Sequence, residues 1–121
     1  MSKTILVVED QEDNRRILRD LLTSKGYDII EATDGLAGVE AAKSERIDLI
    51  LMDIQLPTID GYEATRRIKA EPETADVTII AVTSYALSGD KQKALEAGCD
   101  DYVAKPYSPR ELLAMIEQYL G

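Results

Sequence analysis

The chain has 121 residues, 45% of them hydrophobic, and its 23 acidic and 14 basic residues give a formal net charge of −9. This length suits a single domain. The acidic balance argues against direct binding to DNA or insertion into an anionic membrane surface, because both depend on basic protein surfaces. The sequence contains no histidine, which excludes Ser-His-Asp and Cys-His catalytic sites and a histidine-ligated zinc.

The chain also lacks the marks of a membrane or secreted protein. No apolar run approaches the roughly 18 residues of a membrane span. The N-terminal sequence MSKTILVVED is not a signal peptide, because its short apolar run ends in two acids. Cys99 is the only cysteine, so no internal disulfide can form, and nothing nearby marks the thiol as reactive. These features predict a cytoplasmic protein.

Short apolar runs alternate with amphipathic segments along the chain. The runs predict strands at 4–8, 27–32, 49–52, 78–83 and 101–104. The amphipathic segments predict helices at 14–26, 36–45, 62–71, 88–98 and 108–120. We expect Gly26 and Gly98 to stop the first and fourth helices, and Ser108 with Glu111 to form a capping box at the start of the fifth.

Apolar strands joined by helices predict a parallel sheet that is covered on both faces. Right-handed crossovers then leave few topologies for this α/β chain. The predicted fifth helix reaches almost to the last residue, so we expect a single domain over residues 1–121 without an attached output domain.

Polar residues stand where these predicted strands end. In an open parallel sheet, ligands bind beyond the carboxyl ends of the strands, where the strand order reverses. Glu9 and Asp10 follow the first strand, Asp53 follows the third, Thr83 closes the fourth and Lys105 follows the fifth. If the first and third strands are neighbours, three carboxylates meet in one pocket, with a hydroxyl and an ammonium at its rim.

Clustered carboxylates of this kind attract a cation. Two unit charges about 4 Å apart cost about 4 kcal/mol at an effective dielectric constant of about 20. Oxygen ligands without histidine or thiolate favour Mg²⁺ or Ca²⁺, and so few protein ligands leave room for water and a phosphate oxygen, which favours Mg²⁺. A neighbouring aspartate could then attack a phosphoryl group to give an aspartyl phosphate.

Four motifs stand in order at these strand ends: VVED at 7–10, LMDIQLPTIDG at 51–61, AVTSYA at 81–86 and GCDDYVAKP at 98–106. Together they resemble the response regulator receiver family over nearly the whole chain, in particular single-domain regulators of chemotaxis and cell division and receivers fused to hybrid histidine kinases. The resemblance implies a flavodoxin-like receiver fold: a doubly wound, five-stranded parallel α/β sheet in the order 2-1-3-4-5 with five helices.

The resemblance also implies roles at the acidic positions. Asp53 would be the phosphoacceptor. Asp10 and Asp53 would bind Mg²⁺ directly, Glu9 would act through water, and the backbone carbonyl of Gln55 would be a further ligand. Gln55 stands at a variable position of the family, so the dephosphorylation rate stays open.

Three further positions complete the implied site. Thr83 and Lys105 would bind oxygens of the phosphoryl group, and the Lys105–Pro106 peptide bond would be cis. Tyr102 would be the switch aromatic whose rotamer couples to Thr83.

The implied function is that of a phosphoacceptor in a two-component system or phosphorelay, and not of an enzyme beyond its own phosphotransfer and autodephosphorylation. A sensor histidine kinase or histidine phosphotransfer protein would supply the phosphoryl group, docking on the first helix and the loop at Pro106, around Asn14, Arg15 and Leu18. A downstream protein effector would be contacted through the fourth helix, fifth strand and fifth helix, including Lys91, Tyr102 and Tyr107. The chain would be a monomer or a phosphorylation-dependent dimer.

Alternatives stay open for single residues and for the whole chain. Asp53 alone is explained equally well as a strand end, and Glu9, Asp10 or Asp13 as a cap of the first helix. A receiver-like scaffold that is not phosphorylated is the main alternative function. A flavin-binding module is disfavoured because the acidic EDQED segment at 9–13 would repel a phosphate. A phosphatase or phosphomutase would need a second acid near Asp53, where Gln55 stands.

Overall fold

The computed structural model describes residues 2–84 and 90–121. The last residues of the AVTSYA motif, at 85–86, and the first residues of the predicted fourth helix, at 88–89, lie outside this part. Within it, strands and helices alternate, beginning with β1 (Thr4–Val8) and α1 (Glu12–Thr23). The remaining elements are β2 (Asp28–Ala32), α2 (Gly35–Ser44), β3 (Leu49–Asp53), α3 (Gly61–Ala70), β4 (Thr78–Thr83), α4 (Asp90–Ala97), β5 (Asp101–Ala104) and α5 (Pro109–Leu120).

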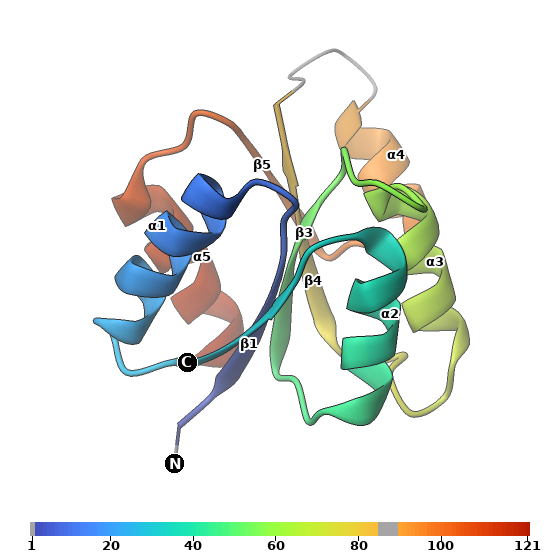
Figure 1. Ribbon diagram of the computed structural model, residues 1–121, viewed down its shortest axis with the longest axis horizontal. Helices are drawn as coiled ribbons and strands as arrows, with labels where there is room; N and C mark the ends of the chain where they lie inside the picture. The colour runs from blue at the N-terminus through green and yellow to red at the C-terminus, as the bar shows by residue number, and fades with distance from the viewer. Residues whose placement is uncertain (1, 85–89) are drawn as a thin grey trace.

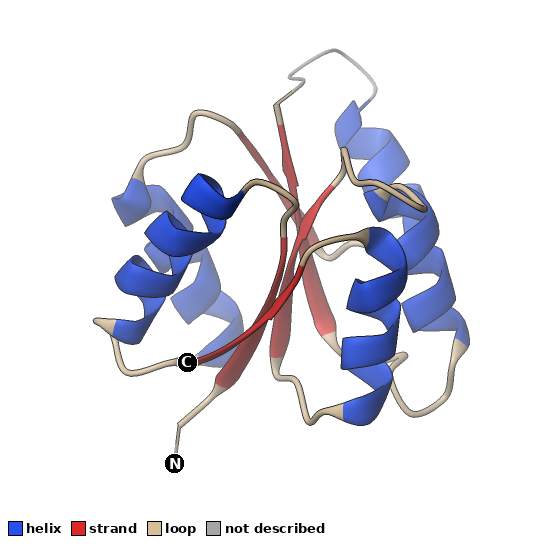
Figure 2. Ribbon diagram, viewed as in Figure 1, coloured by secondary structure: helices blue, strands red, loops and turns tan. Residues whose placement is uncertain are grey.

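The strands form one five-stranded parallel sheet in the order β2-β1-β3-β4-β5. The helices α1 and α5 cover one face of the sheet, and α2, α3 and α4 cover the other (Figure 1, Figure 2). The predicted doubly wound α/β fold and its strand order are therefore confirmed. Because the strand order reverses between β1 and β3, the carboxyl ends of these two strands border the expected ligand position.

Side chains of the central strands alternate between two hydrophobic cores. In β1, Ile5 and Val7 join the core with α1 and α5, whereas Leu6 and Val8 join the core with α2, α3 and α4. Each residue of β3 is buried as well. Burial on both faces explains why these strands have continuous apolar sequences, and each fully buried Leu or Ile contributes roughly 1.5–3 kcal/mol to stability.

Within the described residues, the side chains that precede α2, α3 and α5 each accept a hydrogen bond from the first turn of the helix. Asp34, Asp60 and Ser108 each accept from the backbone amide three residues later, at the starts of α2, α3 and α5. Such a cap satisfies one of the amides that a helix leaves without an internal partner. The predicted cap at Ser108 is confirmed.

The start and end of α1 differ from the prediction. The helix begins at Glu12, with Gln11 at the N-cap position and no side-chain cap, so the alternative interpretation of Glu9, Asp10 or Asp13 as its cap is not supported. Asp13 instead pairs with Arg16 at 3.2 Å. The helix ends at Thr23, and Gly26 follows in the turn beyond it with a φ of 89°.

The buried face of α1 bears on the expected docking surface. Leu18 and Leu22 are buried beneath the helix, whereas Ile17 has 57% of its surface exposed. Leu18, at 4% exposure, cannot contact a docking partner, so the expectation that it does so is wrong. The exposed apolar residue of this stretch is Ile17.

The strand β3 is one residue longer than predicted and ends in Asp53 itself. The turn after it is closed by a 2.9 Å hydrogen bond from the Gly61 amide to the Ile54 carbonyl. A Cβ atom added to Gly61 would lie 2.2 Å from the Asp53 carbonyl oxygen. The start of α3 is therefore packed directly against the backbone of Asp53, and only glycine fits there.

We expect Gly61→Ala to lower the free energy of unfolding by about 2 kcal/mol or more, because the overlap forces the loop or α3 to move. Gly26→Ala is the matched control: its Cβ would meet nothing within 4 Å, so only its positive φ is penalised, by about 1 kcal/mol. Urea unfolding followed by circular dichroism measures both losses. Equal losses in the two variants would contradict the close-approach argument.

Candidate functional site

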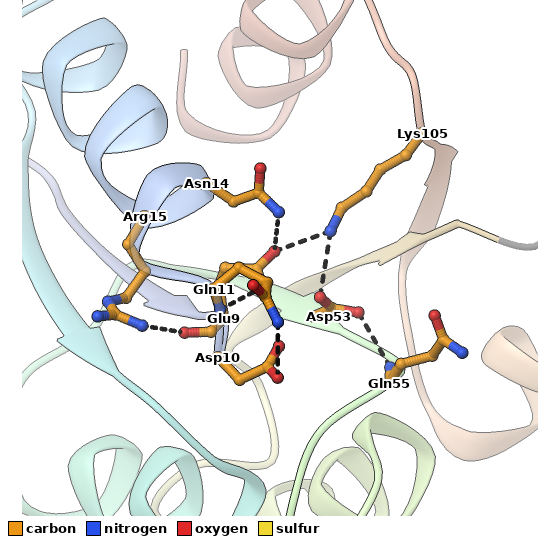
Figure 3. A network of polar contacts seen from close by, with 8 residues as sticks. All are labelled: Glu9, Asp10, Gln11, Asn14, Arg15, Asp53, Gln55 and Lys105. Carbon is orange, nitrogen blue, oxygen red and sulfur yellow. Dashed lines mark hydrogen bonds and ion pairs between the residues drawn. The ribbon is translucent and has the colours of Figure 1, made fainter.

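Three carboxylates meet at the carboxyl ends of the two central strands. β1 and β3 are paired, with Val8 opposite Met52, so the residues that follow these positions emerge side by side. Ligand oxygens of Glu9, Asp10 and Asp53 all lie within 4.8 Å of one another (Figure 3). Glu9 and Asp53 are 2% and 5% exposed. The expected carboxylate cluster is thus present, and two of its members are buried.

An ammonium group balances the two buried carboxylates. Lys105 Nζ donates to Glu9 Oε1 at 2.8 Å and to Asp53 Oδ2 at 3.2 Å (Figure 3). Burial by itself would lower the pKa of Lys105, but the hydrogen bond to Glu9 and the charge of Asp53 outweigh it and raise the pKa. The ammonium therefore stays charged throughout the physiological range. The Lys105–Pro106 peptide bond that follows is cis.

Asp53 is held from its other oxygen as well. The backbone amide of Gln55 donates to Asp53 Oδ1 at 2.9 Å. The Gln55 side chain extends away from the acidic cluster (Figure 3). The structure thus shows an amide contact of Gln55 with the carboxylate, which the sequence did not predict.

The start of α1 and the loop before it secure Glu9. The Gln11 amide donates to Glu9 Oε2 at 3.0 Å, and Asn14 Nδ2 lies 3.5 Å from Glu9 Oε1. Arg15 donates to the Glu9 carbonyl at 2.9 Å and lies 3.5 Å from a carboxylate oxygen of Glu31 on β2.

Sequence reasoning missed this positioning role of Arg15. With 15% of its side chain exposed, Arg15 mainly contacts Glu9 and Glu31. It contributes less to the docking surface on which we expected it. A basic residue in the first turns of a helix normally indicates a solvated face, so no sequence signal distinguished it.

Thr83 and Tyr102 lie on the adjoining strands. Thr83 ends β4, is 1% exposed and is paired with Ala104. Tyr102 on β5 is partly buried against the core with α2, α3 and α4. A cleft of about 480 Å³ opens beside the carboxylates, lined by Asp10, Ile54, Gln55, Leu56, Pro57, Asp60, Tyr62 and Thr83.

Comparison with known proteins identifies the family. The family model described as the response regulator receiver domain matches residues 5–117. The chain belongs to this family. It is thus the receiver domain of a two-component response regulator, a signalling protein, and the predicted resemblance is confirmed.

Two relatives lie near this receiver domain in sequence. The polar-differentiation response regulator DivK of Brucella anthropi is 40% identical over 121 residues, which cover 100% of this chain and 98% of the relative. The receiver domain of a sensor histidine kinase from Pseudomonas aeruginosa PAO1 is 41% identical, with a TM-score of 0.93 and coverage of 100% and 99% of the two chains. That structure holds a magnesium ion coordinated in its active-site cleft.

A third likeness comes from a complex. The structure of the Saccharomyces cerevisiae histidine phosphotransfer protein Ypd1 with the receiver domain of its downstream response regulator Ssk1 contains a chain that is 31% identical to this one. The TM-score is 0.91, and the match covers 98% of this receiver domain and 88% of that chain. Among the residues that the structure describes, no helix is long and apolar enough to cross a membrane.

The donor set of this receiver domain fits Mg²⁺. The clustered groups are carboxylates, the oxygen ligands that hard divalent cations prefer. A carboxylate offers about four acceptor positions. Within the described residues, that of Asp10 accepts one long hydrogen bond, 3.4 Å from Gln11 Nε2. Asp10 also lines the open cleft, so it has both the capacity and the access that a metal ligand needs.

We expect Lys105→Met to lower the free energy of unfolding by about 2 kcal/mol at neutral pH, because two buried carboxylates are left without their cation. The folded pKa of Lys105 lies above its ordinary value of 10.5. Its contribution is therefore complete below pH 10.5 and is lost as the pH rises through the folded pKa. Urea unfolding of wild type and variant across this range measures both effects.

Lys93→Met is the matched control, since Lys93 is exposed on α4 and its loss should change stability by less than about 0.5 kcal/mol. If Lys105→Met is as stable as Lys93→Met, the ammonium does not balance the buried carboxylates.

Proposed function

We propose that this receiver domain accepts a phosphoryl group on Asp53 from a phosphohistidine of a partner protein, with Mg²⁺ bound, and thereby changes its contacts with a downstream protein. The observation that carries this proposal is the placement of Asp53 at the end of the buried strand β3, with Glu9 and Asp10 beside it and the Lys105 ammonium 3.2 Å from its Oδ2. An unphosphorylated scaffold has no need for this charge arrangement.

The transfer is a displacement at phosphorus. A carboxylate oxygen of Asp53 forms the new P–O bond while the P–N bond to the partner's imidazole breaks. The electron pair of that bond returns to the imidazole nitrogen. The contacts from Gln55 and Lys105 hold the carboxylate in a fixed orientation, and such positioning is a main source of rate in phosphoryl transfer.

Asp10 and Asp53 would hold Mg²⁺ directly, Glu9 would act through water, and the Gln55 carbonyl would be a further ligand. When bound, the ion would neutralise the acids and the oxygens of the incoming phosphoryl group. The magnesium ion in the Pseudomonas aeruginosa receiver supports this assignment. Lys105 and Thr83 would hold the transferred group, since Lys105 already contacts Asp53 and Thr83 lines the cleft together with Asp10.

A phosphoryl group adds roughly −1.5 to −2 charge at this point. Thr83, drawn toward it, would alter the packing between β4 and β5, where Tyr102 is paired with Ala81. Tyr102 is the proposed switch residue for this reason. A local charge change of this kind can shift the balance between two arrangements of a packed segment. Lys91, Tyr102 and Tyr107 would then form part of the surface that a downstream protein binds.

The phosphodonor would dock where an apolar groove leads to Lys105. This groove has a volume of about 510 Å³ and is lined by Asn14, Ile17, Ser84, Lys105, Pro106, Tyr107 and Pro109. Ile17 takes the place that we had given to Leu18. The complex of Ypd1 with the Ssk1 receiver supports a phosphotransfer protein or a histidine kinase as the partner.

We expect Asp53→Asn to abolish transfer from a panel of phosphorylated histidine kinases and phosphotransfer proteins, compared at short times, while circular dichroism stays unchanged. The amide keeps the shape of the side chain but lacks the nucleophilic carboxylate. Asp60→Asn is the matched control seven residues later, because asparagine caps a helix as well as aspartate does. Full labelling of Asp53→Asn would contradict the assignment of Asp53 as the phosphoacceptor.

We expect Asp10→Asn to weaken Mg²⁺ binding at least about tenfold in a calorimetric titration, because a charged oxygen ligand is lost. Asp13→Asn is the control, since the Asp13 side chain is 83% exposed and paired with Arg16. Equal Mg²⁺ affinity in the two variants would remove Asp10 from the metal site.

A further inference from the structure

Thr58 has an unfavourable backbone conformation close to the proposed phosphorylation site. Its φ is 68°, and among the described residues it is the non-glycine residue with positive φ. A β-branched side chain is strained in this region. Such strain persists only where surrounding contacts impose it, and it gathers at functional sites.

The contacts that impose this conformation come from the start of α2. The Thr58 hydroxyl donates to Asp34 Oδ1 at 3.3 Å and accepts from the Leu36 amide at 3.2 Å. The Gly35 amide donates to the Pro57 carbonyl at 3.2 Å. The loop between β3 and α3 is therefore fastened to the N-terminus of α2 by three hydrogen bonds at two consecutive loop residues.

The start of α2 and the loop between β3 and α3 are also in close contact. A Cβ atom added to Gly35 would lie 2.1 Å from the Ile59 carbonyl oxygen. Asp34 is itself fixed, because its Oδ1 accepts from the Ala37 amide at 2.7 Å as the cap of α2. The loop is thus anchored to a rigid helix end and not to a mobile side chain.

This anchor lies three residues beyond Gln55, whose amide donates to Asp53 Oδ1 at 2.9 Å. The loop is closed at its base by the hydrogen bond from Gly61 to Ile54. That base bond fixes the two ends of the loop but not the segment between them. The contacts of Pro57 and Thr58 hold the part of the loop that directly follows Gln55 and Leu56, and these two residues line the cleft.

We propose that Thr58 is a positioning residue: its hydroxyl, held by Asp34 and the start of α2, keeps the Gln55 amide on the Asp53 carboxylate and the Gln55 backbone at the metal cleft. The metal part of this inference rests on the proposed function, whereas the amide part does not. The strained φ of Thr58 is maintained because the hydrogen bonds of its hydroxyl with Asp34 and Leu36 require it.

Three substitutions at Thr58 distinguish the loss of its hydroxyl contacts from a general loss of stability. Thr58→Val keeps the branched shape and loses the hydroxyl. Thr58→Gly loses the hydroxyl and also relieves the strain, so its unfolding midpoint should not fall below that of Thr58→Val. Thr58→Ser keeps the hydroxyl and should behave as wild type. Thr23→Val is the matched control, because the Thr23 hydroxyl bonds the Arg19 carbonyl at the end of α1.

The readouts are the solvent exchange of the Gln55 amide, measured by NMR without metal, and the Mg²⁺ affinity. We expect exchange about tenfold faster and Mg²⁺ binding at least about threefold weaker in Thr58→Val and Thr58→Gly. The Ile54 amide, bonded to the Val82 carbonyl, should exchange as in wild type.

Unchanged Gln55 exchange in Thr58→Val and Thr58→Gly would overturn the proposal, as would equal acceleration at Gln55 and Ile54, which would indicate general loosening. If wild type fails to bind Mg²⁺ or to accept a phosphoryl group, the proposed function falls, and the Gln55 exchange alone still decides whether Thr58 positions the loop.

Discussion

The site depends on one interaction, the ammonium of Lys105 placed between the buried carboxylates of Glu9 and Asp53. Two carboxylates taken out of water side by side repel each other, and each also loses hydration. Lys105 offsets both effects while leaving Asp10 open toward the cleft. A phosphoryl group arriving at Asp53 would meet a positive charge that is already in position, which is the condition for electrostatic stabilisation without reorganisation.

The rest of the fold brings this interaction about. Lys105 follows β5 at one edge of the sheet, whereas Glu9 follows β1, and the order β2-β1-β3-β4-β5 sets Asp53 between them. Arg15 fixes the Glu9 backbone from α1, and Gly61 lets α3 approach the backbone of Asp53. The start of α2 fastens the loop through Thr58. The starts of α1, α2 and α3 therefore restrain the segments that follow β1 and β3.

The apolar runs and amphipathic segments of the sequence predicted the strands and helices and placed Glu9, Asp10 and Asp53 at strand ends. The strand order that brings these three carboxylates together was predicted only through the resemblance to the receiver family. The sequence could not predict which face of α1 is buried, because Ile17 and Leu18 are both apolar and packing on the sheet decides between them. It also missed the role of Arg15 and the φ of Thr58. Both follow from contacts with segments distant in the chain, namely Glu31 on β2 and the start of α2.

The central claim is that Asp53 is the residue that becomes phosphorylated. The most direct test is to treat the wild-type protein with a small phosphoryl donor such as phosphoramidate in the presence of Mg²⁺, and to locate the added group by tandem mass spectrometry of its peptides. We expect a single acyl phosphate on Asp53 that does not form when Mg²⁺ is chelated. An adduct on Asp10 or Asp60, or no adduct on any aspartate, would contradict it.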